Sequence, residues 1–164
     1  MKANWGLAQY FISLLISKTF VMSQDLNILY VEDNEDYIDF VKRAVKKNNL
    51  PVTVSSVTDG QKVVEYLTSH DETIKKANLI LLDIHLPGID GIELLKKLRK
   101  DEHMALVPVI MFSTSDNPAD VKKCYSYGAN AYVVKPMGID QLSSSLTSIY
   151  HFWLNHNYNK TVSS

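Results

Sequence analysis

The sequence predicts an α/β protein: a doubly wound, five-stranded parallel sheet with five helices. Five short apolar runs alternate along the chain with five amphipathic stretches of helical spacing. Two of the runs, 79–82 and 109–112, contain no polar residue, as expected of strands that helices cover on both faces. The chain has 164 residues, 46% of them hydrophobic and 21% charged, which suits one ordinary globular domain.

The predicted strands are short runs that end at charged, hydroxyl or turn-forming residues. The first run is followed by two acids. The second run alternates polar and apolar residues and is followed by the turn residues Asp59 and Gly60. The strands are therefore expected at residues 28–31, 52–57, 79–82, 109–112 and 131–134.

The predicted helices keep apolar residues three and four positions apart and are bounded by turn residues. The first helix is stopped by Asn48, Asn49 and Pro51, and Gly128 closes the fourth. The helices are expected at residues 36–47, 61–69, 92–100, 118–127 and 139–155.

The last predicted helix carries more aromatic residues than one core-facing stripe requires. The predicted stripe consists of Ile139, Leu142, Leu146, Ile149 and Trp153. Tyr150, Phe152 and Leu154 are additional to it. Such a surplus on an exposed helix indicates an interface, and burial under the N-terminal extension or the sheet edge is the alternative.

The alternation of strands and helices also restricts the topology. Crossovers between parallel strands are right-handed, and the flavodoxin-like strand order 2-1-3-4-5 is the arrangement we expect. This domain spans residues 25–157 and is followed by a polar tail, 158–164. No internal repeat or second domain is evident in the sequence.

Residues 1–24 precede the predicted domain as an N-terminal extension. Their apolar run, 10–16, is too short to span a membrane and lacks a signal-cleavage pattern. It could be an interfacial amphipathic helix, an unusual signal or anchor, or a flexible extension from a mis-called start with Met22 as the initiator. We favour the last, because the residues after Met22 form a polar lead-in to the first strand, and we expect no stable membrane insertion.

Charge and cysteine content exclude several classes of protein. The net charge of -1 argues against a dedicated nucleic-acid binder, which usually carries a basic excess. The single cysteine, Cys124, cannot form an internal disulfide or a cysteine-ligated zinc site. We therefore expect a cytoplasmic protein without a nucleic-acid partner.

Charged and hydroxyl residues follow four of the five predicted strands. Glu32 and Asp33 follow the first strand, Asp83 the third, Ser113 the fourth and Lys135 the fifth. The carboxyl ends of the strands form the ligand-binding edge of such a sheet. Because strands one and three are neighbours about 4.8 Å apart, three acids would converge and repel each other without a cation. A cluster of oxygen ligands suits Mg²⁺.

This constellation suits phosphoryl transfer. An ionised Asp83 beside Mg²⁺ can attack phosphorus as a nucleophile and form an aspartyl-phosphate. Lys135 would contribute a positive charge for the phosphoryl oxygens, and Ser113 a hydroxyl donor. Acids at strand ends often serve only as solvated groups or helix caps. That plainer interpretation suits a lone acid better than a set drawn from four strands.

Four segments of the chain match a known family: ILYVEDNEDY (28–37), LILLDIHLPGIDGIELLKKLR (79–99), VPVIMFSTS (107–115) and GANAYVVKPM (128–137). In these segments the sequence resembles the receiver domain of two-component response regulators, in its single-domain, chemotaxis-regulator-like form. The resemblance covers roughly residues 26–150. The Phe152-Trp153 ending bears a weaker resemblance to phytochrome-associated response regulators, some of which dimerise through this face.

The resemblance implies the chemistry of each pocket residue. Asp83 would accept a phosphoryl group from a histidine kinase or phosphotransfer protein. Asp33 and Asp83 would ligate Mg²⁺ directly, Glu32 through water, and His85 through its backbone carbonyl. Lys135 would be the family's phosphoryl-binding lysine.

The resemblance also implies a switch. Ser113 would move toward the phosphoryl group, Tyr132 would rotate inward, and the face made by the fourth helix, fifth strand and fifth helix would change its binding to a downstream protein. The bond before Pro136 is expected to be cis.

We therefore expect a signalling switch without an output domain, whose only reactions are its own phosphorylation and dephosphorylation. A Mg²⁺-dependent phosphatase of the haloacid dehalogenase type is disfavoured, because His85 stands where those enzymes carry a second Asp. No hydroxyl-rich phosphate loop supports a flavoprotein, and the neutral charge disfavours a DNA-binding regulator. An unphosphorylated receiver-like scaffold stays open as an alternative.

Overall fold

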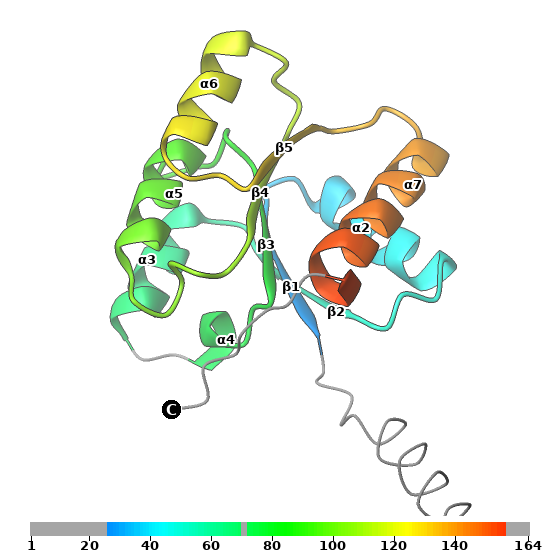
Figure 1. Cartoon of the computed structure of the whole chain (residues 1–164), viewed down its shortest axis with the longest axis horizontal. Coiled ribbons are helices and arrows are strands. Elements are labelled where there is room, and N and C mark those ends of the chain that lie inside the picture. Colours follow the sequence, from blue (N-terminus) through cyan, green and yellow to red (C-terminus); the bar gives the residue numbers. More distant parts are fainter. Residues whose placement is uncertain (1–25, 70–71, 157–164) are drawn as a thin grey trace, which may run out of the picture.

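A parallel sheet is the centre of the computed structural model, which describes residues 26–69 and 72–156 (Figure 1). Its strands lie in the order β2 (Thr53–Val57), β1 (Asn27–Val31), β3 (Leu79–Leu82), β4 (Val109–Ser113) and β5 (Ala131–Val134). This order confirms the predicted order 2-1-3-4-5. All neighbouring pairs are parallel, as predicted. The predicted extension, residues 1–24, and the polar tail, 158–164, lie outside the described residues.

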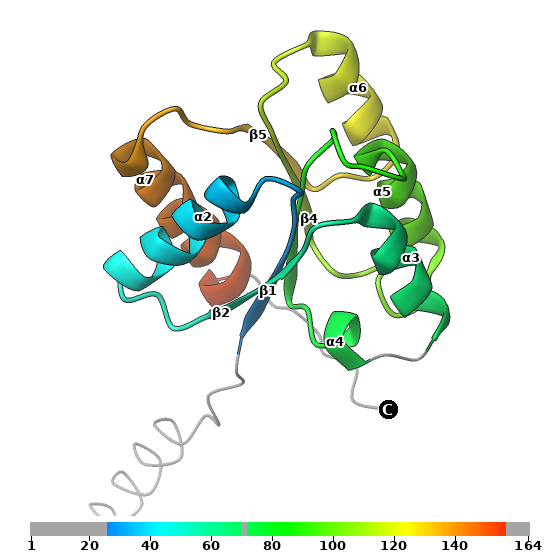
Figure 2. The same cartoon turned by 180° about the vertical axis from the view of Figure 1, so that it is seen from behind.

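The five predicted helices cover the two faces of this sheet. One face carries α2 (Glu35–Lys47) and α7 (Ile139–Ile149), which pack against each other. The other face carries α3 (Gly60–Thr68), α5 (Gly91–Lys100) and α6 (Pro118–Ser126), as the view from behind shows (Figure 2). A four-residue helix that the sequence did not predict, α4 (Glu72–Lys75), lies in the connection to β3. Among the described residues, no helix is long and apolar enough to cross a membrane.

Alternation along the strands divides the core into two layers. In β1, Leu29 and Val31 belong to the layer under α3 and α5, whereas Ile28 and Tyr30 belong to the layer under α2 and α7. The whole of β3 is buried, because helices cover it on both faces. The sheet is therefore a firm support for side chains that extend past its carboxyl edge.

Helix caps organise the loops at that edge. Asn34, Asp59, Asp90 and Asn117 each accept a hydrogen bond from the backbone N–H two residues further on. They begin α2, α3, α5 and α6, the helices that follow β1, β2, β3 and β4. Each of these loops is thereby fixed by its strand at one end and by the helix cap at the other.

The last helix differs from its prediction. After α7 the chain continues as a π-helix, η1 (Tyr150–His156). Tyr150 and Leu154 belong to the same core layer as Leu142 and Leu146, from which they continue at spacings of four residues. For these two residues the structure shows burial, the alternative that the sequence left open, whereas Phe152 is 62% exposed. Ile139 was wrongly placed in the core stripe: it begins α7 one turn before the helix reaches the core, and it is half-exposed.

Candidate functional site

The predicted side chains converge past the carboxyl ends of the strands. One carboxylate oxygen from each of Glu32, Asp33 and Asp83 lies within 4.8 Å of the other two. Glu32 and Asp83 are almost fully buried, whereas Asp33 is exposed. The neighbouring positions of β1 and β3 in the sheet bring the three acids together.

Lys135 lies between two of these acids. Its Nζ donates to Asp83 Oδ2 at 2.7 Å and also to Glu32 Oε2. The lysine is 4% exposed, so the ion pairs are shielded from water. Three carboxylates and one ammonium have a formal charge of -2, which a single divalent cation balances.

Glu32 is held by two further donors. The Tyr30 hydroxyl donates to Glu32 Oε2 at 2.8 Å, and the backbone N–H of Asn34 donates to Oε1 at 3.2 Å. Burial raises the pKa of the Tyr30 phenol and the two nearby carboxylates raise it further, which keeps the phenol protonated as a donor. Sequence reasoning missed Tyr30, although it stands two residues before Glu32 on the same face of the strand.

Asp83 is fixed by its own backbone surroundings. Its Oδ1 accepts from the N–H of Ile84 at 2.6 Å, while Oδ2 accepts from Lys135. Gly91 lies so close behind it that an added Cβ would stand 1.9 Å from the Asp83 carbonyl oxygen. The N–H of Gly91 donates to the Ile84 carbonyl at 2.8 Å. The start of α5 is thus packed directly against the backbone of Asp83.

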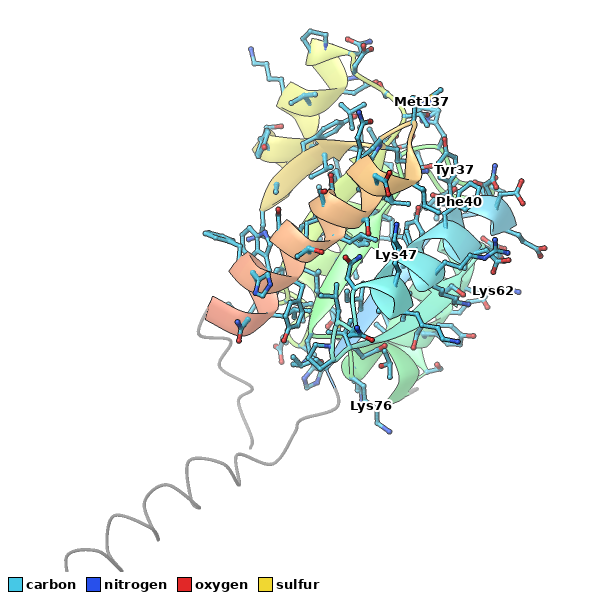
Figure 3. All side chains as sticks on the ribbon, turned by 90° about the vertical axis from the view of Figure 1, so that its right-hand side faces the viewer. Tyr37, Phe40, Lys47, Lys62, Lys76 and Met137 are labelled. Atoms are coloured by element: carbon cyan, nitrogen blue, oxygen red, sulfur yellow. The ribbon has the colours of Figure 1, made fainter. Side chains whose placement is uncertain are left out.

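Tyr37 covers Lys135 from α2. The ammonium lies 4.4 Å from the centroid of the tyrosine ring, within the range of a cation–π interaction. In Figure 3, Tyr37 and Phe40 of α2 project at the same end of the molecule as Met137, which follows β5. Phe40 and Met137 are exposed, and Tyr37, which contacts Lys135, is half-buried.

The predicted switch residues are linked by a loop. Ser113 is buried, and its Oγ accepts from the N–H of Ser115 at 3.4 Å. Tyr132 is half-buried, and its hydroxyl donates to the Ser115 carbonyl at 2.8 Å. The Ser115 hydroxyl donates to Asp120 Oδ2 of α6 at 3.0 Å. Ser113, β5 and α6 are therefore connected through Ser115.

The expected cis bond before Pro136 is wrong. No peptide bond of the described residues is cis, so Lys135 and Pro136 are joined in trans. Trans is the more stable form of an X–Pro bond, and Lys135 reaches both carboxylates from it. The side chain of His85 is exposed beside the pocket.

Comparisons with known proteins identify the family. A family model described as the response regulator receiver domain matches residues 28–147. The chain belongs to this family. Similar curated proteins include the probable methanogenesis regulatory protein FilR2 of Methanothrix harundinacea, which is 30% identical over 79% of this chain and 84% of its own length. Response regulator Rcp1 of Synechocystis is 30% identical over 77% of this chain and 88% of its own.

Solved structures agree with this assignment. The phosphorylated cyanobacterial phytochrome response regulator RcpA has a TM-score of 0.73 and 33% identity, covering 80% of this chain and 96% of that one. The Mn²⁺-bound form of Rcp1 has a TM-score of 0.71 and 29% identity over the same shares. The receiver domain of sensor kinase PA1611 from Pseudomonas aeruginosa, with magnesium in its active-site cleft, has a TM-score of 0.64 and 26% identity, covering 79% of this chain and 98% of that one.

The acidic pocket of this receiver domain has the donor set that Mg²⁺ requires. Its carboxylates offer hard oxygen ligands, and Asp33 faces solvent, where waters can complete an octahedral shell. The described cluster contains no thiolate or imidazole ligand that would favour zinc.

Proposed function

We propose that Asp83 is the phosphoacceptor of this receiver domain. The observation that carries the proposal is the position of its carboxylate, bonded to Lys135 and beside Glu32 and Asp33. A carboxylate oxygen of Asp83 attacks the phosphorus of a phosphohistidine whose ring is protonated on its other nitrogen. As the O–P bond forms, the P–N bond breaks, its electron pair returns to the ring, and the histidine leaves as neutral imidazole. The donor is a histidine kinase or a phosphotransfer protein.

Mg²⁺ would be held by Asp33 and Asp83, by Glu32 through water and by the backbone carbonyl of His85. When bound, it neutralises the charge of the transferred phosphoryl group. Lys135 brings a second positive charge to those oxygens, and Ser113 brings a hydroxyl donor. The chain contributes position and charge rather than acid–base groups, as phosphoryl transfer requires.

The phosphorylated state ends by hydrolysis of the acyl phosphate. Water attacks phosphorus and releases inorganic phosphate, which restores the Asp83 carboxylate. We propose that no external substrate is turned over, so that the protein acts as a switch rather than as a metabolic enzyme, and that it works in the cytoplasm, where a histidine kinase presents its phosphohistidine.

The output of the switch is the face made by α6, β5 and α7. Exposed apolar side chains lie on or beside these elements, namely Tyr125, Tyr127, Val134, Met137, Ile139 and Phe152. Such a patch suits a protein partner. We propose that a downstream protein binds there, and that a homodimer forms through the last helix.

The direct test is phosphorylation by a small donor. With Mg²⁺ and acetyl phosphate, intact-protein mass spectrometry should show one added phosphoryl group that is lost on treatment with hydroxylamine. Asp83→Asn should remove it, because an amide is a poor nucleophile, and Asp116→Asn of the exposed loop before α6 is the matched control that keeps it. A wild-type protein that takes no label would support the unphosphorylated scaffold instead.

A further inference from the structure

The buried tyrosine of β1 has a contact that the proposed chemistry does not use. Tyr30 is 0% exposed and is among the largest fully buried side chains of the described residues. Its ring packs edge-on against Phe112 of β4, with the centroids 6.0 Å apart. Its hydroxyl, at the far end of this fixed ring, donates to Glu32 Oε2.

The hydrogen bonds of Glu32 divide its two oxygens. Oε2 accepts from both Tyr30 and Lys135, so its two lone pairs are used within the protein. Oε1 accepts only the Asn34 N–H among the described contacts and keeps capacity for a further donor. A water bound to a metal ion is such a donor.

We propose that Tyr30 is a positioning residue that holds Glu32 Oε2 against Lys135 and thereby presents Oε1 to the hydrated Mg²⁺. This proposal rests on the proposed function, because it assumes that Mg²⁺ binds this pocket. A tyrosine has only two side-chain torsions, and core packing fixes both. The terminal torsion of a glutamate is broad. The rigid ring therefore restrains the softer carboxylate.

A plain core role for Tyr30 makes a different prediction. If the hydroxyl only avoids being buried without a partner, its removal changes the free energy of unfolding but not the Mg²⁺ affinity. If the hydroxyl positions Glu32, its removal weakens Mg²⁺ binding, and it does so only while Glu32 is present.

The experiment is titration calorimetry of Mg²⁺ into full-length protein without any phosphodonor. Tyr30→Phe should weaken Mg²⁺ binding about threefold to tenfold. This is less than the loss typical for a direct partner of a metal ligand, because Glu32 would act through a water. In a Glu32→Ala background, the same substitution should change the affinity by less than about twofold, since its effect passes through Glu32.

Tyr150→Phe is the matched control. It removes a hydroxyl from a buried tyrosine of the same core layer, in η1, and should leave the Mg²⁺ affinity unchanged. Circular dichroism and thermal unfolding without Mg²⁺ establish that each variant is folded. If Tyr30→Phe does not fold, Tyr30→Met, whose flexible side chain fills irregular core space without a hydroxyl, is compared with Tyr150→Met in the same titrations.

The outcomes separate this proposal from the proposed function. If wild-type protein binds Mg²⁺ and is phosphorylated at Asp83, but Tyr30→Phe binds Mg²⁺ equally or more tightly, only the role of Tyr30 is overturned. An equal loss with and without Glu32 also overturns it. If wild-type protein binds no Mg²⁺, the proposed function and the role of Tyr30 fail together.

Discussion

Lys135 explains how two buried acids coexist in this pocket. Its ammonium bonds to both Glu32 and Asp83, and it faces the ring of Tyr37. Buried ion pairs cost desolvation, and removing one partner leaves the other charge unpaired in a medium of low dielectric. The lysine therefore stabilises the two buried carboxylates, in addition to the role in phosphorylation that we propose for it.

Replacing Lys135 by methionine tests this role. In the absence of Mg²⁺, Lys135→Met should lower the free energy of unfolding by about 3 kcal/mol, because two buried carboxylates lose their cation. Saturating Mg²⁺ should restore more stability to the variant than it adds to wild-type protein, since the ion then balances the same carboxylates. Urea unfolding with and without Mg²⁺ measures both quantities.

Lys47→Met is the control for this substitution. The Lys47–Asp140 pair, at 3.0 Å, is largely exposed on both sides, and pairs of this kind contribute about 0–1 kcal/mol. Its variant should stay close to wild-type stability and respond to Mg²⁺ as the wild type does. A similarly small effect of Lys135→Met would contradict the stabilising role of the buried lysine.

At the residue scale, the sequence predicted those pocket residues whose place depends only on their position at the end of a strand. Glu32, Asp33, Asp83 and Lys135 converge because parallel strands place their carboxyl ends at one edge. Tyr30 was not predicted, because a tyrosine inside an apolar strand is equally consistent with ordinary core packing. Its hydroxyl contact depends on rotamers that no pattern of residue types encodes.

At the scale of elements, the contact between β3 and α5 fixes the position of Asp83, the proposed phosphoacceptor. Gly91 begins α5, and its amide bonds to the Ile84 carbonyl next to Asp83. An added Cβ would stand 1.9 Å from the Asp83 carbonyl oxygen, which is closer than any real contact. The backbone must therefore separate if position 91 carries a side chain.

Gly91→Ala should lower the free energy of unfolding by about 2–3 kcal/mol, through this overpacking. It should also slow labelling of Asp83 by acetyl phosphate, because the displaced backbone carries the carboxylate with it. Gly138→Ala is the control: the nearest atom to an added Cβ there is 3.8 Å away, at an ordinary van der Waals distance. Equal stability of the two variants, measured by urea unfolding, would argue against a close-packed β3–α5 contact.

The elements themselves were predicted well where periodicity is regular. The ranges of β3 and β5 agree with the prediction, and α2 and α5 each begin one residue earlier than expected. The last helix was predicted as one element, 139–155, whereas the structure has α7 to Ile149 and then the π-helix η1. Tyr150 and Leu154 are buried there together with Ile149, and the sequence had left their burial open as the alternative to an interface.

At the scale of the whole molecule, the pocket lies past the carboxyl ends of the strands, whereas the proposed output face lies along β5, the last strand of the sheet, and the helices on either side of it. Ser115 connects them, since it bonds to Ser113 through its N–H, to Tyr132 through its carbonyl and to Asp120 through its hydroxyl. A Ser113 hydroxyl that turns toward a phosphoryl oxygen gives up the Ser115 contact. Loss of this contact frees Ser115 to move, and Ser115 is bonded to both Tyr132 of β5 and Asp120 of α6.

The free energy needed to shift the equilibrium between two packings of the α6–β5 region is modest. Moving a two-state equilibrium from about 1:10 to about 10:1 takes roughly 2.7 kcal/mol. One or two hydrogen bonds to a charged phosphoryl group, at about 1.5–3 kcal/mol each, are sufficient. Phosphorylation can therefore shift the population between two packings of the α6–β5 region without any large rearrangement of the sheet.

Hydrogen exchange with a phosphoryl mimic tests the connection across the molecule. Beryllofluoride with Mg²⁺ should change amide exchange both around Asp83 and in α6 and β5 of wild-type protein. In Ser113→Ala, the change around Asp83 should persist, because the mimic still binds, while the change in α6 and β5 should largely disappear. Ser144→Ala is the control, because the Ser144 hydroxyl donates to the Asp140 carbonyl within α7, and it should behave as wild type. If α6 and β5 respond equally in Ser113→Ala, the signal does not pass through this hydroxyl and Ser115.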